Sequence, residues 1–494
     1  MINNTQVWWW YTAAGVMFFL AFLHPFLLWL VVPAVAVLIH AITLNHNPLL
    51  VLKGALLVGT LKAAGGIAWF LHSFPISWLG IESAEAQLLL ISFYWLSVSL
   101  MIGVGFAIFI FATHYFGKQY PFAYLLLFPL TFVLAEIFSS LVFSLYSIGP
   151  GITLNVGFTF GYVGYALAAS TLTLPLASLG GIYALSAGVG GLGVLLYLLT
   201  WRREWSRLKL FLVVYVLLIL LIVTVTQSPD TANHSSNNQK VAAVYTYLPA
   251  DVLVSKEGPR IRKQAVSEAV ELAATHYPDI IVLPEMANFQ SHFPTSEELL
   301  DYLSERGDPI VIDSKKVTRS NGHSGVSSLI YDSARNTTYT IDKNFLVPQG
   351  EYLPYLIIGA LKLLGQKDFL ERYSKEYVYQ PGTPADYSSI PDNVPSVLFC
   401  FSSVMPNGVA KEKAGRDTKL LVHPIAHGWF HEPHLMWLQL DLMLKTQAVQ
   451  NRVTIVKAGN MAPEKLYLPD GSTTHGLLAG GGKYWKVFIY DVAN

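Results

Sequence analysis

Long apolar runs dominate the first 226 residues of this 494-residue chain. A helix that crosses a lipid bilayer needs about 20 predominantly apolar residues. Runs close to or above that length are predicted to form seven spans, at 7–22, 25–42, 50–72, 86–112, 121–145, 176–199 and 209–226. The same 226 residues hold only seven of the 32 Lys and Arg residues and four of the 32 Asp and Glu residues. We therefore predict a multi-span α-helical membrane domain at residues 1–226.

The basic residues of this domain predict its orientation, because Lys and Arg near span ends stay on the cytoplasmic side. The only dense basic stretch, WRREWSRLK at 201–209, lies between the last two predicted spans. Lys53 and Lys118 fall on the same side of the predicted topology. We therefore expect a cytoplasmic N-terminus, with everything after about residue 227 outside the cytoplasm. The first run lacks the basic start of a cleavable signal and is expected to remain as a helix.

The remainder of the chain has the pattern of a separate α/β domain. A polar linker, QSPDTANHSSNNQK at 227–240, leads into it. From 241 to 494, short apolar runs such as KVAAVYTYL and DIIVLPE predict strands, and amphipathic helices such as 261–276 and 434–451 follow some of them. Such alternation predicts layers of helices packed on a sheet. The net charge of zero argues against a nucleic-acid partner, which would require a basic surface.

Three reactive side chains stand at the ends of predicted strands. Glu285 follows IIVLP, Lys343 follows TTYTID and Cys400 follows SVLF. Strand ends are where open α/β sheets place their chemistry, since the strand fixes the position and the loop leaves it accessible. Cys400 is the only cysteine in the chain, which excludes an intramolecular disulfide and a multi-thiolate metal site. Taken alone, it is either a buried bystander or a reactive thiol.

The segments VLPE, DKNFLVPQGEYLP and VLFCF resemble the three motifs of the nitrilase superfamily, which uses a Glu, Lys, Cys triad in this chain order. The segment 423–462, in which Trp429 and Phe430 precede a helix, is also similar to that family. A membrane domain in front of such a domain resembles the apolipoprotein N-acyltransferase branch, as do AEIFSSLVFSLYSIGPG and PLASLGGIYALSAGVGGLGVLLYLL. The resemblance implies an αββα sandwich, a nitrilase-like catalytic domain, for residues 241–494.

The resemblance also implies a reaction and its residues. Glu285 would be the general base, Cys400 the nucleophile and Lys343 the cation that stabilises the oxyanion, with Glu351 as the family's second glutamate. An acyl group would pass from a membrane phospholipid or a protein donor to Cys400 as a thioester, and then to an amine of a lipoprotein or another exported protein. No cofactor is implied. The implied location is a bacterial inner membrane, with the catalytic domain in the periplasm.

Further residues are expected to contact the substrate. The resemblance assigns Trp429 and Phe430 to the lining of the acyl pocket. Phe401 and Ser402 stand where the acyltransferases have Tyr and Glu, which predicts an unusual substrate. Glu136 lies inside a predicted span, in FVLAEIFSS, and is either a functional group or a carboxyl that bonds to neighbouring helices.

Other interpretations remain open. Conjugal-transfer proteins of the TraB type have a similar layout, so the alternative is transfer of an acyl or peptidyl group onto a pilin, and a third is a non-enzymatic membrane scaffold. The apolar stretch 352–369 either enters the bilayer interface or packs on the membrane domain.

The histidine-rich HPIAHGWFHEPH at 423–434 has the density of a zinc site. Pro433 interrupts the helix that an i, i+4 ligand pair needs, so no metal is predicted.

Overall fold

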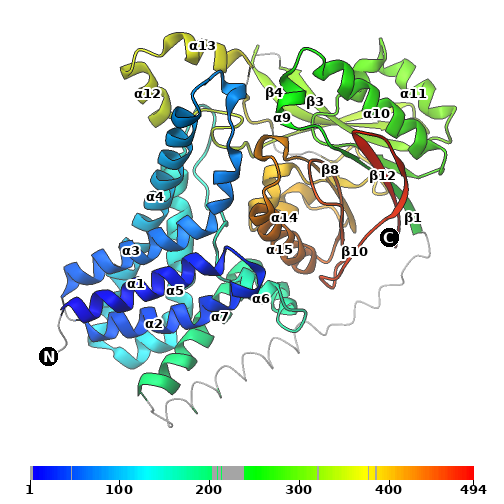
Figure 1. The fold of residues 1–494 in the computed structure, drawn as a ribbon. Coiled ribbons are helices and arrows are strands. Elements are labelled where there is room, and N and C mark those ends of the chain that lie inside the picture. The colour runs from blue at the N-terminus through cyan, green and yellow to red at the C-terminus, as the bar shows by residue number, and fades with distance from the viewer. Residues whose placement is uncertain are drawn as a thin grey trace.

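The computed structural model describes residues 4–45, 47–202, 209, 213, 238–319, 322–376, 378–383 and 387–493. Almost all of the seventh predicted span, 209–226, and of the predicted linker, 227–240, lies outside these residues. The described chain forms a helical region and an α/β domain that lie in contact with each other (Figure 1).

The helical region contains most of the predicted spans. Its elements are α1 (Asn4–Ala21), η1 (Pro25–Leu30), α2 (Val31–Leu44), α3 (Pro48–Gly66), η2 (Ala68–Ser73), η3 (Ser77–Leu79), α4 (Ala84–Gln119), α5 (Pro121–Tyr146), α6 (Tyr165–Ala168), η4 (Leu174–Leu179), α7 (Gly181–Tyr197) and η5 (Leu198–Arg202). Among the described residues, five helices are long and apolar enough to cross a membrane, and they coincide with predicted spans two to six. The first predicted span is a helix, α1, but does not belong to these five.

Helix α4 is longer than a bilayer requires. Its 36 residues extend about 54 Å at 1.5 Å per residue, whereas the hydrocarbon core is about 30 Å thick. Its N-terminal end reaches toward α12 (Tyr355–Leu363) and α13 (Lys367–Glu376) of the α/β domain (Figure 1). The Tyr94 hydroxyl in this part of α4 donates a hydrogen bond to the Gln349 side chain. This end of the helical region therefore contacts the α/β domain directly.

One continuous 12-stranded sheet, folded into two layers, organises the α/β domain. The first layer has the order β11-β12-β1-β2-β3-β4-β5 and the second the order β6-β7-β8-β9-β10. They meet where β1 and β8 pair at Thr246 and Asn460. The strands are β1 (Asn238–Thr246), β2 (Ile280–Val282), β3 (Ile310–Thr318), β4 (Ser324–Asp332), β5 (Thr337–Asp342), β6 (Ser396–Val397), β7 (Leu420–Ala426), β8 (Thr454–Asn460), β9 (Leu466–Tyr467), β10 (Thr473–Thr474), β11 (Leu477–Gly481) and β12 (Trp485–Ala493).

Helices cover the outer face of each layer. Successive side chains of a strand point to opposite faces, so Val241, Ala243 and Tyr245 of β1 enter the core between the two layers. Ala242 and Val244 instead pack toward α10 and α11. The helices and short helical turns of the domain are α9 (Ala250–Val254), α10 (Gly258–Ala274), η6 (Phe289–His292), α11 (Ser296–Ser304), η7 (Cys400–Val404), α14 (Gly408–Lys413), η8 (Gly428–Phe430) and α15 (His434–Asn451).

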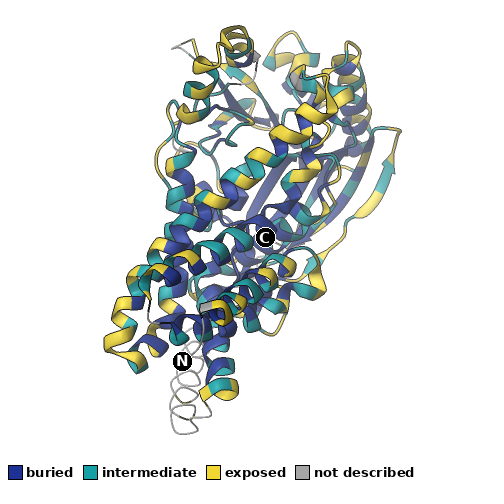
Figure 2. Cartoon of the chain, turned by 60° about the vertical axis from the view of Figure 1, so that its left-hand side comes forward, coloured by how far each residue is buried: buried dark blue, intermediate teal, exposed yellow. Residues whose placement is uncertain are grey.

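The second layer repeats this pattern. Leu420 and Val422 of β7 face the core between the layers, whereas Leu421 packs toward α14 and α15. The order is therefore helices, sheet, sheet, helices, which confirms the predicted αββα architecture. Figure 2 shows the consequence, because the strands between the helical layers are mostly buried while the covering helices keep one exposed face.

Helix α15 belongs to two cores at once. Its Leu444 and Ala448 pack on the second sheet layer, while Met436 joins the core of the helical region. Gln439 donates a hydrogen bond from Nε2 to the Gly66 carbonyl of α3 at 2.7 Å. The two parts of the chain therefore share a packed interface along α15.

Candidate active site

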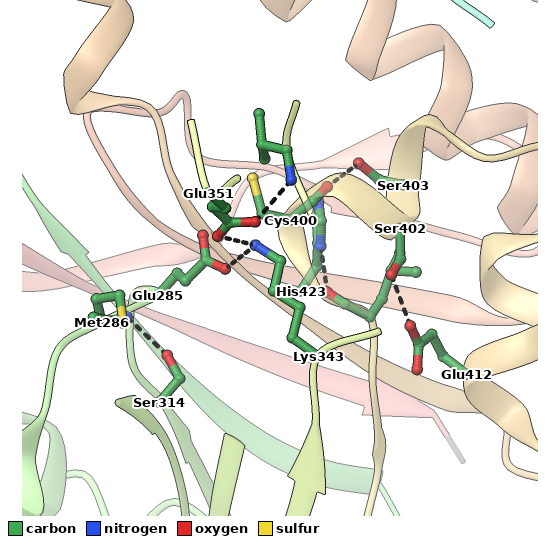
Figure 3. Close-up of polar contacts among 12 residues, drawn as sticks. Glu285, Met286, Ser314, Lys343, Glu351, Cys400, Ser402, Ser403, Glu412 and His423 are labelled. Carbon is green, nitrogen blue, oxygen red and sulfur yellow. Dashed lines mark hydrogen bonds and ion pairs between the residues drawn. The ribbon is translucent and has the colours of Figure 1, made fainter. Parts of the chain in front are cut away.

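The residues predicted for catalysis come from the ends of strands in both layers of the sheet. Glu285 follows β2, Lys343 follows β5 and Cys400 begins η7, which follows β6. Figure 3 shows that these side chains and that of Glu351 converge on one spot. The structure thus brings together four residues from three distant segments of the chain, while their catalytic roles stay predictions.

Lys343 is the centre of this cluster. Its Nζ donates hydrogen bonds to Glu285 Oε1 at 2.8 Å and to Glu351 Oε1 at 2.7 Å. The side chain is completely buried. Burial works against its charge, but the carboxylates of Glu285 and Glu351 outweigh burial and raise the pKa of Lys343 above its usual range. The site therefore holds a fixed cation.

Glu351 is oriented by the loop that carries it. The backbone N–H of Val347 donates to Glu351 Oε2 at 2.8 Å, which leaves Oε1 for the lysine. The next residue, Tyr352, donates its hydroxyl to the Ser147 carbonyl of the helical region at 2.9 Å. The position of Glu351 is thus tied to the helical region.

Cys400 lies on a turn that is held from both sides. Ser403 Oγ donates to the Cys400 carbonyl at 2.7 Å. Two residues before the cysteine, the Leu398 carbonyl accepts a hydrogen bond from His423 Nδ1 at 2.6 Å. The short β6 and the turn after it therefore fix where the thiol lies.

The electrostatics of the cluster favour a protonated thiol beside a basic carboxylate. Burial raises the pKa of the Cys400 thiol above its usual range, and the charge of Glu285 adds to this effect while Lys343 opposes it. Burial also raises the pKa of Glu285, although the charge of Lys343 and a hydrogen bond with Cys400 lower it. A carboxylate with a raised pKa is a better base than a free one. The arrangement can therefore move a proton from sulfur to Glu285.

One functional candidate was missed from the sequence. Ser402 Oγ donates to Glu412 Oε1 at 2.7 Å, and both side chains are buried. Burial raises the pKa of Glu412 to about 7. The sequence showed only that Ser402 stands where the acyltransferases that it resembles have a glutamate. No local sequence pattern predicts that Glu412 of α14 contacts Ser402, so Glu412 could be found only from the fold.

The aromatic residues predicted to bind substrate lie where the α/β domain meets the helical region. The ring centroid of Trp429 is 4.7 Å from that of Trp78, and the centroid of Phe430 is 5.4 Å from that of Trp69. Phe401 and Phe430 are partly buried against the core of the helical region. Their contact with a substrate remains a prediction.

Glu136 is buried in the helical region. On α5, it pairs with Lys62 Nζ of α3 at 2.9 Å, and its Oε1 accepts from the Val163 N–H at 2.9 Å. Lys62 and Val163 are its hydrogen-bond and ion-pair partners among the described residues. This is the interhelical alternative left open by the sequence, and a role in substrate binding stays a prediction.

The clustered histidines differ in their surroundings. His423 and His427 are buried, whereas His434 is exposed and His431 lies near the Pro75 carbonyl, with Nε2 at 3.2 Å. In the part of the chain that the structure describes, no three His, Cys, Asp or Glu side chains form a group that could hold a metal ion.

Comparison with known proteins gives a distant likeness in fold. No family model matches the sequence, and no curated protein matches it. Similar solved structures include a mutant of the Nesterenkonia AN1 amidase from the nitrilase superfamily, with 16% identity, 52% of this chain and 91% of that chain covered, and a TM-score of 0.33. Another is Saccharomyces cerevisiae Nit3, a member of branch 10 of the nitrilase superfamily, with 14% identity, coverage of 52% and 91%, and a TM-score of 0.34.

Proposed function

We propose that this chain is a membrane-bound acyltransferase of the carbon–nitrogen hydrolase type, with Cys400 as the acyl carrier. The observation that carries the proposal is the position of Lys343, whose Nζ lies between Glu285 and Glu351 at 2.8 and 2.7 Å and faces Cys400. A buried cation shared by two carboxylates beside a single thiol supplies a base, an electrophilic partner and a nucleophile in one place.

The first half-reaction forms a thioester. Glu285 takes the proton of Cys400 while Sγ attacks the carbonyl carbon of an ester or amide. The Lys343 ammonium stabilises the developing oxyanion in a site that excludes water. The carbon–oxygen or carbon–nitrogen bond then breaks, and Glu285 returns the proton to the leaving alcohol or amine.

The second half-reaction transfers the acyl group. An amine attacks the thioester carbonyl, and Glu285 accepts a proton from the amine nitrogen. The carbon–sulfur bond breaks, the proton passes to Sγ, and the thiol of Cys400 is restored together with an amide product. Glu351 holds Lys343 in position throughout, because Val347 fixes the carboxylate of Glu351.

Contacts with the helical region support a donor that comes from the membrane. The Thr159 hydroxyl donates to the Val404 carbonyl in the turn after Cys400 at 2.6 Å. The Tyr355 N–H, at the start of α12, donates to the Ile148 carbonyl at 2.8 Å. Both contacts come from the segment between the predicted spans 121–145 and 176–199, which the predicted orientation puts outside the cytoplasm. The proposed orientation places the site next to the outer leaflet.

Helix α12 supports the same placement. Leu356 and Leu363 are 61% and 91% exposed, and Leu364 directly after the helix is 72% exposed. An apolar, exposed helix close to a bilayer surface favours insertion into the interface. In this proposal α12 admits the acyl chain of a phospholipid, and Trp429 and Phe430 line its path to the thiol.

A transfer assay tests the proposal. Full-length protein in proteoliposomes is supplied with phospholipid carrying a radiolabelled acyl chain and with a diacylated lipopeptide that has a free N-terminal amine. We expect labelled amide from wild type and none from Cys400→Ala. Transfer that survives in Cys400→Ala would overturn the proposal, and a wild type active only with a peptidyl donor would replace the phospholipid by a protein donor.

A further inference from the structure

A second candidate site lies behind the sheet. A cavity of about 290 Å³ is lined by residues of β7, β8 and α15. Its volume is at the lower end of the range of about 300–1,000 Å³ that small-molecule sites occupy. Lys457 of β8 lines it and has the same parity as Ile455, which packs toward α15 rather than between the sheet layers. None of the residues placed in the candidate active site lines this cavity apart from His423.

Lys457 is the unusual member of the lining. The residue is only 5% exposed. Among the described residues, no oxygen lies within hydrogen-bond or ion-pair distance of its Nζ, and the centroid of the Tyr467 ring is 5.8 Å away. A buried ammonium without a partner is costly, because buried charges are stable only when paired. The geometry therefore leaves room for an anion beside Lys457.

The nearest acidic residue is already occupied. Asp441 of α15 accepts hydrogen bonds from Lys465 Nζ at 2.7 Å and from the Tyr467 hydroxyl at 3.1 Å. Lys445 Nζ lies 3.4 Å from the other carboxylate oxygen of Asp441. Lys465, which lines the cavity together with Asp441, already balances the charge of Asp441, so Lys457 leaves the wall with an excess of positive charge.

Two histidines offer uncharged polar edges to the same space. His423 uses Nδ1 to donate to the Leu398 carbonyl, which leaves Nε2 without a proton. His427 Nδ1 accepts from Trp437 Nε1 at 3.1 Å, so its proton is on Nε2. Burial lowers the pKa of both imidazoles to about 3, which keeps them neutral at physiological pH. His427 therefore supplies a hydrogen-bond donor without a competing charge.

The wall that α15 forms is mostly apolar, although Asp441 and His434 also belong to it. Trp437, Leu438, Leu440 and Leu444 of α15 line the cavity, together with Ile425 of β7. A hydrated inorganic ion would leave this wall without a partner. We propose that the cavity binds a small amphiphilic anion, whose carboxylate or phosphate group pairs with Lys457 and whose carbon chain lies along Trp437 and Leu440.

Equilibrium dialysis with radiolabelled hexanoate tests this proposal on the detergent-purified full chain. We expect one molecule of hexanoate per wild-type chain at pH 7 and at least tenfold weaker binding to Lys457→Met. Lys445→Met is the matched control, because Lys445 pairs with Asp441 but does not line the cavity. Its affinity should equal that of the wild type. No hexanoate binding to wild type, or equal binding to Lys457→Met, would overturn the proposal.

Competition separates the parts of the ligand. Hexyl phosphate should displace the labelled hexanoate, which would show that a phosphate and a carboxylate head group both bind. Displacement by unlabelled hexanoate but not by hexyl phosphate would identify the carboxylate as the head group. Hexylammonium should not compete, and inorganic phosphate should compete at least tenfold more weakly than hexyl phosphate. Competition by hexylammonium, or equal competition by inorganic phosphate, would contradict the charge or the chain part of the proposal.

The wild type alone provides a test that needs no variant. Burial lowers the pKa of Lys457 to about 8. Asp441, Lys465 and Glu464 are the charged groups around it, and ordinary carboxyl and lysine groups do not titrate between about pH 7 and 9. Hexanoate affinity should therefore fall by up to about tenfold per pH unit above about pH 8, as Lys457 loses its proton. Constant affinity across this range would count against Lys457 as the anchor.

Discussion

Two buried lysines, Lys343 in the α/β domain and Lys62 in the helical region, form ion pairs of nearly equal length. Lys343 Nζ lies 2.8 Å from Glu285, and Lys62 Nζ lies 2.9 Å from Glu136. Lys343 has a second carboxylate, Glu351, at 2.7 Å, and it faces a thiol. The difference shows that a buried ion pair alone does not mark a reactive site. The additional carboxylate and the thiol distinguish the candidate active site.

The surroundings of the two ion pairs also distinguish a structural pair from a candidate active site. The rings of Phe106 and Tyr162 lie 6.0 and 5.7 Å from Lys62 Nζ, and Val163 bonds Glu136 from the segment after α5. These contacts join α3, α4 and α5 to that segment. The Lys62 pair thus stabilises helix packing, whereas the Lys343 cluster lies at strand ends, where loops leave chemistry accessible.

The largest expected effect is on activity. Glu285→Gln removes the base but leaves Lys343 paired with Glu351, so we expect acyl transfer to fall about 10²–10⁴-fold. The thermal unfolding midpoint should change little. The measurement is the transfer assay with labelled phospholipid, combined with a melting curve. Activity within threefold of wild type would show that Glu285 is not the base.

A stability effect should follow from the other pair. Glu136→Gln leaves the Lys62 ammonium buried without its counter-charge, a change that costs about 3–5 kcal/mol in buried pairs. We expect a lower thermal unfolding midpoint in detergent and normal transfer per folded molecule. The double variant Lys62→Met with Glu136→Gln should recover most of the loss. Lost transfer at unchanged stability would instead give Glu136 a functional role.

The protonation state of the thiol gives a pH-dependent prediction. Because burial raises the pKa of Cys400, the resting enzyme holds a thiol at pH 7, and alkylation by iodoacetamide should be slow there and accelerate up to and beyond pH 9. Cys400 is the only cysteine, so mass spectrometry reads a single site. Rapid alkylation at pH 6 would mean that Lys343 keeps a thiolate at rest.

The smallest effect is expected at Glu412. Its raised pKa, about 7, means that the folded state binds a proton more tightly than the unfolded state. Its contribution to stability is therefore present below the unfolded pKa, about 4.3, and is lost as pH rises to about 7. Glu412→Gln should flatten this part of the pH–stability curve. Transfer should fall about tenfold or less, because Ser402 keeps a hydrogen-bond partner. A pH–stability curve that is the same in Glu412→Gln and in wild type would mean that another group titrates in this range.

The strand-end residues could be predicted from sequence because apolar runs locate strands and the residue after each run is fixed by the sheet. That argument found Glu285, Lys343 and Cys400, and the resemblance to nitrilases added Glu351. The helix at 434–451 was found equally well, since its bounds coincide with α15.

Long-range partners could not be predicted in this way. Lys62 and Glu136 are 74 positions apart in sequence, and their pairing depends on how α3 and α5 pack. Glu412 reaches Ser402 only through the fold of α14. Lys457 was not predicted, although its place inside the apolar run VTIVKAG was a signal that its side chain is buried. The short strands β9 and β10 have two residues each, too few for a periodic pattern.

Intact-protein mass spectrometry of the wild type and Cys400→Ala, both incubated with phospholipid and without an amine acceptor, tests the central claim most directly. We expect a fatty acyl adduct on the wild type alone, which neutral hydroxylamine removes because it is a thioester. An adduct on both proteins, or no adduct on the wild type with either phospholipid or peptidyl donors, would contradict Cys400 as the acyl carrier.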